Sequence, residues 1–193
     1  MGNILHIETS AAYCSVSVAK DGISISAITG SVVNDHISQL TTIIQEVVNK
    51  SGLTLQNLDA IAVSAGPGSY TGLRIGVSTA KGLCHALSLP LIAVNSLESM
   101  VYGINGNYPE NTLFCPLIDA RRMEVYTLLA DSTANIIIPQ QAYIMEPEHL
   151  FLQELESQQI VFFGSGVNTC KALREDPNSI FHDDYILEAG SMV

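Results

Sequence analysis

The segment GPGSYTGLRIG, residues 66–76, has the densest set of residues that could bind a phosphate. It lies between an expected strand and an expected helix, and helix N-termini at such positions often bind anions. Its spacing fits no Walker loop, because no lysine follows any of its glycines. It fits no dinucleotide fingerprint either, since the sixth position from Gly66 is Thr71. The spacing therefore favours a tight turn with close helix–sheet packing over phosphate binding.

The histidines and serines do not form a local catalytic or metal-binding pattern. No two of the histidines lie three to five residues apart, and these are His6, His36, His85, His149 and His182. The sequence contains no HExxH, and Gly68 directly precedes Ser69, so GxSxG is absent as well. The histidine at 6 is expected to be structural, and the one at 36 to cap a helix or contact a partner. A protease is therefore not expected.

The composition indicates a globular chain that repels nucleic acid. Hydrophobic residues make up 47% of the chain and charged residues 14%, which supports a packed core. The formal net charge is −11, and such a surface repels phosphate backbones. The four dispersed cysteines are expected to be buried free thiols. Since no run could span a bilayer and no signal peptide opens the chain, a cytoplasmic location is expected.

The chain shows one order of elements twice. The first series is a three-stranded meander, a helix capped by Asn34 or Asp35, a strand, a helix, a strand and a short helix capped by Asn95 or Ser96. Its strands are expected at 3–9, 14–20, 23–29, 58–64 and 90–94, and its second helix at 72–88. After a connector at 103–109, strands are expected at 113–118, 123–130, 136–144 and 160–163, with helices at 147–156 and 166–174.

This order predicts an α/β protein of two similar lobes, each a mixed sheet with helices. We place the lobes at 1–104 and 105–193 and expect the second to be shortened at its C-terminal end. By analogy, this is the plan of the actin/hexokinase/Hsp70-like (ASKHA, ribonuclease H-like) fold.

Four segments resemble one known family, in the same order along the chain. They are IETS at 7–10, LDAIAV at 58–63, SAGPGSYTGLRIG at 64–76 and DARRMEVY at 119–126. The glycine turn and the DARR segment together are highly specific. On these segments the chain resembles the TsaB (YeaZ) family of tRNA threonylcarbamoyladenosine biosynthesis, and the resemblance covers essentially the whole chain.

The resemblance implies a non-catalytic subunit without cofactor or metal. The related TsaD (Gcp/Kae1) family transfers threonylcarbamoyl from its adenylate to the tRNA adenosine next to the anticodon, and carries a metal-binding His-x-x-x-His. Here Ser96 and Met100 stand at those positions, and both are poor ligands for a divalent ion. Glu8 replaces the family's aspartate near the phosphate side. An independent ATPase or small-molecule kinase of the same fold is the alternative.

The resemblance also implies a partner surface on two helices. Helix 72–88 has a stripe of smaller residues, which suits close helix approach, and the preceding helix has a wide apolar arc. Ordinary burial of both helices would explain the same pattern. The expected interface residues are His36, Leu40, Ile44, Val47, Arg74, Ile75, Ser78, Thr79, Gly82 and Ala86. The implied partners are a TsaD-type subunit, a TsaE-type ATPase in a larger complex, and a second copy in isolation. Contact with tRNA would be indirect, and no membrane is implied.

Overall fold

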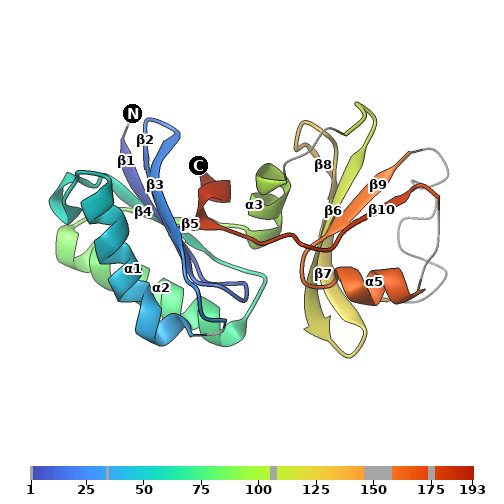
Figure 1. Cartoon of the computed structure of the whole chain (residues 1–193), viewed down its shortest axis with the longest axis horizontal. Coiled ribbons are helices and arrows are strands. Elements are labelled where there is room, and N and C mark those ends of the chain that lie inside the picture. Colours follow the sequence, from blue (N-terminus) through green and yellow to red (C-terminus); the bar gives the residue numbers. More distant parts are fainter. Residues whose placement is uncertain (1, 34, 105–107, 146–157, 174–176) are drawn as a thin grey trace. The chain divides into compact units, whose positions relative to one another are not determined.

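The computed structural model (Figure 1) describes residues 2–33, 35–104, 108–145, 158–173 and 177–193. The chain divides into two compact units. The first comprises residues 1–99 together with Leu187–Val193, and the second comprises Met100–Ile186. The boundary along the chain falls inside helix α3 (Ser96–Gly103).

A mixed sheet of five described strands forms the centre of the first unit, in the order β3-β2-β1-β4-β5. The strands are β1 (Asn3–Glu8), β2 (Ser15–Lys20), β3 (Ile23–Thr29), β4 (Ala60–Ser64) and β5 (Leu91–Val94). β1, β2 and β3 are antiparallel neighbours, whereas β4 and β5 run parallel to β1. Each of these strands was predicted to within two residues from its apolar pattern and its turn signals.

Helices α1 (His36–Lys50) and α2 (Tyr70–Leu87) cover one face of this sheet (Figure 1). Alternate strand residues point at them, and these form a single core with the inner faces of both helices. The Ser69 hydroxyl caps α2 by accepting a hydrogen bond from the Gly72 amide at 3.2 Å. A short 3-10 helix, η1 (Leu55–Asn57), precedes β4.

The last residues of the chain pack on the other face of the same sheet. η2 (Ala189–Met192) contacts β1, β2 and β3, and the buried Ala189 amide donates to Ser15 Oγ at 3.1 Å. Thr29 Oγ1 donates to Glu188 Oε1 at 2.7 Å. Residues 187–193 therefore lie with the first unit, whereas the sequence division at 104/105 had placed them in the second lobe. Hydrogen bonds to strands more than 150 positions away cannot be inferred from local pattern.

The second unit has its own mixed sheet of five described strands, in the order β10-β9-β6-β7-β8. Its strands are β6 (Leu113–Arg121), β7 (Glu124–Ala130), β8 (Ile136–Ile144), β9 (Ile160–Phe163) and β10 (Ser179–His182). α5 (Val167–Leu173) follows β9. Strand β10 was not predicted from the sequence, and the predicted helix at 147–156 lies outside the described residues.

Two mixed sheets with helices confirm the predicted α/β architecture. In the first unit the order β3-β2-β1-β4-β5 brings the carboxyl ends of β1 and β4 together. The glycine turn that follows β4 therefore lies beside the turn that follows β1. None of the described helices combines the length and the apolar character needed to cross a membrane.

Candidate functional site

The glycine turn is packed against the end of β1. Ser69 N–H donates to the Ser10 carbonyl at 2.8 Å, and a Cβ at Gly68 would lie 2.6 Å from that same oxygen. In the first turns of α2, a Cβ at Gly72 would come within 2.0 Å of the Thr9 carbonyl oxygen. Glycine is therefore required here for close contact between backbones. This supports the packing interpretation of the turn.

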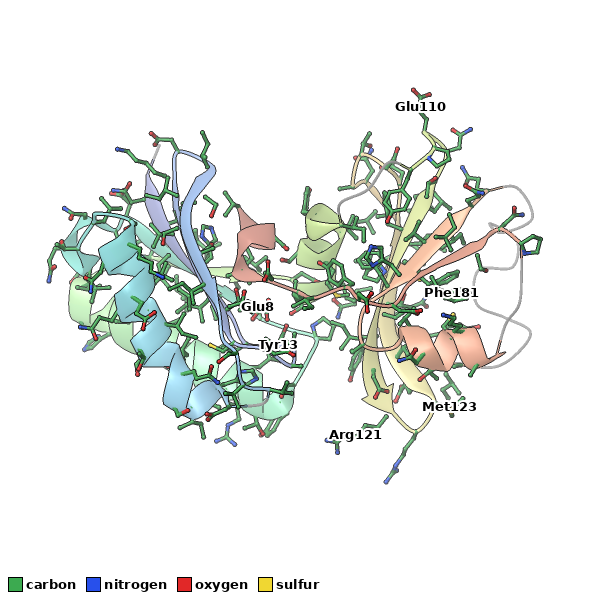
Figure 2. The ribbon with its side chains drawn as sticks, viewed as in Figure 1. Glu8, Tyr13, Glu110, Arg121, Met123 and Phe181 are labelled. Carbon is green, nitrogen blue, oxygen red and sulfur yellow. The ribbon has the colours of Figure 1, made fainter. Side chains whose placement is uncertain are left out.

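Glu8 lies at the carboxyl end of β1, fully buried (Figure 2). Its Oε1 accepts hydrogen bonds from Ser10 N–H at 2.5 Å and from Ser10 Oγ–H at 2.6 Å. Burial raises the pKa of Glu8, and the hydrogen bonds from Ser10 oppose that rise. The carboxyl group therefore stabilises the turn after β1. A carboxylate that orients Mg²⁺ must be open to the ion, whereas the Glu8 side chain has no exposed surface.

The two positions that correspond to the family's histidines are buried on α3. Ser96 and Met100 both have almost no exposed surface. Among the described residues, no group of three or more His, Cys, Asp and Glu side chains could hold a metal ion. The absence of a metal at Ser96 and Met100 stays a prediction.

The predicted interface residues on α2 lie at or near the surface of the first unit. Arg74, Ser78, Gly82 and Ala86 are exposed, and Ile75 and Thr79 are half-buried. No atom lies within 4 Å of the position that a Cβ at Gly82 would occupy. These residues are spaced by three or four positions, so they share one side of the helix. From Ser78 to Ala86, the predicted interface residues on this side of α2 are all small.

The predicted interface residues on α1 are all buried. Leu40, Ile44 and Val47 belong to the core of the first unit, and His36 is buried beside Gly72 at the start of α2. Burial lowers the pKa of His36, which favours a neutral ring. The helical period shows which residues share a face. It does not show whether that face packs against the sheet or stays exposed. The assignment of these four residues to a partner interface stays a prediction.

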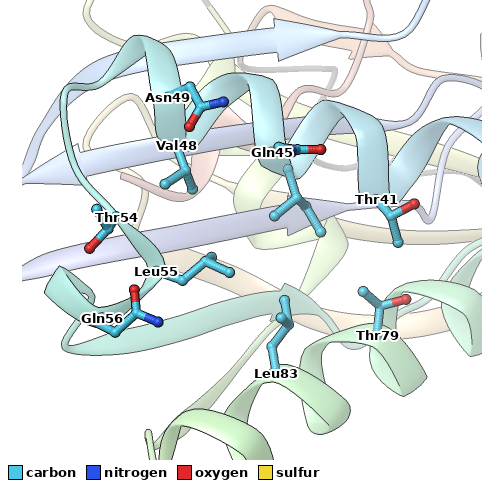
Figure 3. A pocket seen from close by; sticks show the side chains of 10 residues that line it. Thr41, Gln45, Val48, Asn49, Thr54, Leu55, Gln56, Thr79 and Leu83 are labelled. Carbon is cyan, nitrogen blue, oxygen red and sulfur yellow. The ribbon is translucent and has the colours of Figure 1, made fainter.

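A groove separates the outer parts of α1 and α2 (Figure 3). Its volume is about 440 Å³, and η1 closes one end. Ile44 and Leu83 lie along it, with Thr41 and Thr79 facing one another across it. Of the α1 residues predicted for the interface, Ile44 alone lines this groove.

A second exposed feature, not predicted from the sequence, lies at the N-terminal ends of the same helices. Ile37 is 76% exposed and Tyr70 is 75% exposed, and Val32 and Val33 are exposed just before α1. The Arg74 guanidinium lies over the Tyr70 ring, 5.4 Å from its centroid. Ile37 lies three residues before Leu40 and fits the apolar period of α1, so periodicity alone does not identify it as an exposed residue.

Comparison with known proteins gives a consistent result. The family model for "TsaD: tRNA N6-adenosine threonylcarbamoyltransferase" matches residues 29–184. The tRNA threonylcarbamoyladenosine biosynthesis protein TsaB of Bacillus subtilis (strain 168) is 31% identical over 176 residues, 90% of this chain and 75% of that protein. TsaB of Escherichia coli (strain K12) is 30% identical over 191 residues, 95% of this chain and 80% of that protein.

A solved structure shows the same fold. YeaZ from Pseudomonas aeruginosa superposes with a TM-score of 0.83 at 23% identity, covering 100% of this chain and 89% of that one. Sequence identity over nearly the whole length and a matching family model agree with the motifs at the glycine turn and at the DARR segment. The chain therefore belongs to the TsaB family, within the wider group that the TsaD family model describes.

Proposed function

We propose that this chain acts in tRNA threonylcarbamoyladenosine biosynthesis as a non-catalytic subunit that binds and activates a TsaD-type enzyme. The pathway follows from the names of the TsaB relatives that match most of the chain. The family model, which describes the transferase itself, supports a TsaD-type partner. A chain that matches an enzyme family without an evident catalytic constellation is a natural partner of that enzyme.

The exposed side of α2 is the observation that carries this proposal. Gly82, Ser78 and Ala86 present little side-chain bulk, and Gly82 has open space before it. Gly in a helix costs roughly 1 kcal/mol relative to Ala, so a glycine retained in a helix exposed to water needs another reason. Close approach of a second helix provides one. Exposed Ile37 and Tyr70 add apolar area at one end of this surface.

Two features of the site favour a binding role over independent ATP hydrolysis. The Glu8 carboxyl group is buried and hydrogen-bonded to Ser10, an arrangement that suits a structural role in the turn. Ser96 and Met100 supply poor metal ligands at positions where the related family has histidines. With a net charge of −11, the chain itself repels tRNA, so the partner would bind the RNA.

The wider assembly is part of the same proposal. Without its partner, the chain would cover the α2 surface with a second copy, since a two-fold pairing is the simplest cover for one apolar face. A TsaE-type ATPase would join the heterodimer in a larger complex. The place of action would be the cytoplasm, where tRNA is modified.

The test is reconstitution with the cognate TsaD-type enzyme. Light scattering should show a heterodimer. Modification of tRNA by the enzyme should rise at least ten-fold when the chain is added, whereas the chain alone should neither modify tRNA nor hydrolyse ATP. Steady ATP hydrolysis by the purified chain, abolished by Glu8→Ala, would contradict the proposal and favour an independent ATPase.

A further inference from the structure

The turn between β6 and β7 has an unusual backbone. Three consecutive residues have positive φ, namely Arg121 at 71°, Arg122 at 54° and Met123 at 63°. None of them is glycine, asparagine or aspartate, the residues that adopt this region at least cost. The β6–β7 pairing is also irregular here, between Asp119 and Arg121. The chain thus holds three ordinary side chains in a costly conformation at one turn.

A purely structural turn would use other residues. Arg121 pairs with Glu124, so Arg122 and Met123 form a two-residue hairpin loop with positive φ at both positions. Asn-Gly is the sequence that favours such a loop. Strain that persists where a cheaper sequence exists points to a function of the side chains themselves.

The two arginines of this turn are available to a ligand. Both are exposed, and Figure 2 shows Arg121 and Met123 at the free end of the β6–β7 hairpin. Within the part of the chain that the structure describes, the one ion pair is Lys171–Asp183, so no described carboxylate holds either arginine. Asp119 is engaged otherwise, since its Oδ1 accepts from the Arg121 backbone N–H at 2.9 Å. Eight lysines and arginines occur in the whole chain, and two of them stand together here.

Apolar side chains lie next to the arginines. Met123 is exposed, and so is Ile144, which pairs with Glu124 on the neighbouring strand. The Met145 N–H donates to the Met123 carbonyl at 2.6 Å, which fixes the end of β8 beside the turn. Arginine and methionine together are typical of protein–protein interfaces.

We propose that the β6–β7 turn is a second protein-docking point, separate from the α2 surface. Its partner would present carboxylates around an apolar recess, with the guanidinium groups bound to the carboxylates and Met123 in the recess. RNA is disfavoured, because Asp119 and Glu124 flank the arginines and the chain has a net charge of −11. The inference rests on the proposed function, and we name the TsaD-type enzyme as the partner to be tested.

The first variant is the charge reversal Arg121→Glu with Arg122→Glu. It should weaken association with the cognate TsaD-type enzyme at least ten-fold at low salt, and the difference should shrink in high salt, because exposed charges are screened. Lys20→Glu with Lys50→Glu is the matched control, since both lysines are exposed in the first unit. It changes the net charge equally and should bind as the wild type does.

The second variant, Arg122→Asn with Met123→Gly, separates stability from docking. It should raise the melting temperature by a few degrees by relaxing the turn, and still weaken association several-fold. Wild-type binding by both turn variants would overturn the docking point. So would a charge reversal that lowers tRNA binding by the heterodimer without weakening the heterodimer itself, since it would identify an RNA contact. Failure of the wild-type chain to bind the enzyme would overturn this inference and the proposed function together.

Discussion

Two ionisable side chains of β1, His6 and Glu8, are buried on the same face of the first sheet. Desolvation by burial lowers the pKa of His6 to about 4 and raises the pKa of Glu8. Both shifts favour the neutral form in the folded chain. Neutral groups can be buried here without ion pairing, which fits a structural role for both residues.

The two shifts predict opposite effects of pH on stability. Below pH 6.5 the unfolded chain protonates its histidine while folded His6 stays neutral down to about pH 4, so acid should favour unfolding. Above its ordinary pKa of 4.5 the unfolded glutamate is ionised while folded Glu8 retains its proton, so a rising pH should favour unfolding. In the wild type these slopes oppose one another between about pH 4.5 and 6.5.

Single variants should reveal each slope in urea unfolding at several pH values. In Glu8→Gln the free energy of unfolding should fall as the pH falls from 6.5 towards 4, because the pKa values of both His6 and His36 are lowered in the folded chain. In His6→Asn it should instead fall as the pH rises above 4.5. A Glu8→Gln chain whose stability does not change over this range would show that His6 is not shifted.

Among the elements, we expect the short C-terminal segment Leu187–Val193 to contribute strongly to the stability of the first unit. Leu187 is 4% exposed in the first unit, whereas its neighbour Ile186 is 50% exposed. Leu187→Ala should therefore lower the free energy of unfolding by about 2–3 kcal/mol, the usual cost of truncating a buried leucine.

Ile186→Ala is the matched control and should cost well under half as much. Urea unfolding, followed by circular dichroism, measures both. Equal costs would contradict the placement of Leu187 against the first sheet.

Elements with strong local patterns could be predicted from the sequence, and the others could not. The meander β1–β3 and helices α1 and α2 follow clear periods of two and 3.6 residues. Strand β10 has four half-buried residues without alternation, and its identity depends on parallel pairing with β9. The site divides in the same way. The small residues predicted for the interface on α2 are exposed or half-buried, whereas those predicted on α1 belong to the core, and their role at an interface stays a prediction.

At the scale of the whole molecule, the proposed role of the chain is to bind another protein. Its net charge of −11 disfavours RNA, and the exposed side of α2 is an open surface of small residues. The central claim is therefore that this side of α2 binds a TsaD-type enzyme. Gly82 is the position at which the claim can be tested most directly, since added bulk there meets no atom of the folded chain.

The decisive measurement is association of Gly82→Leu with the cognate TsaD-type enzyme, by light scattering over a range of concentrations. The variant should fold with wild-type circular dichroism and bind at least ten-fold more weakly. Gly82→Ala should bind nearly as well as the wild type, and its free energy of unfolding should be higher by up to about 1 kcal/mol. Lys81→Leu, on the flank of the same helix, controls for added apolar area. Wild-type association by Gly82→Leu, with the enzyme and with itself, would contradict the account.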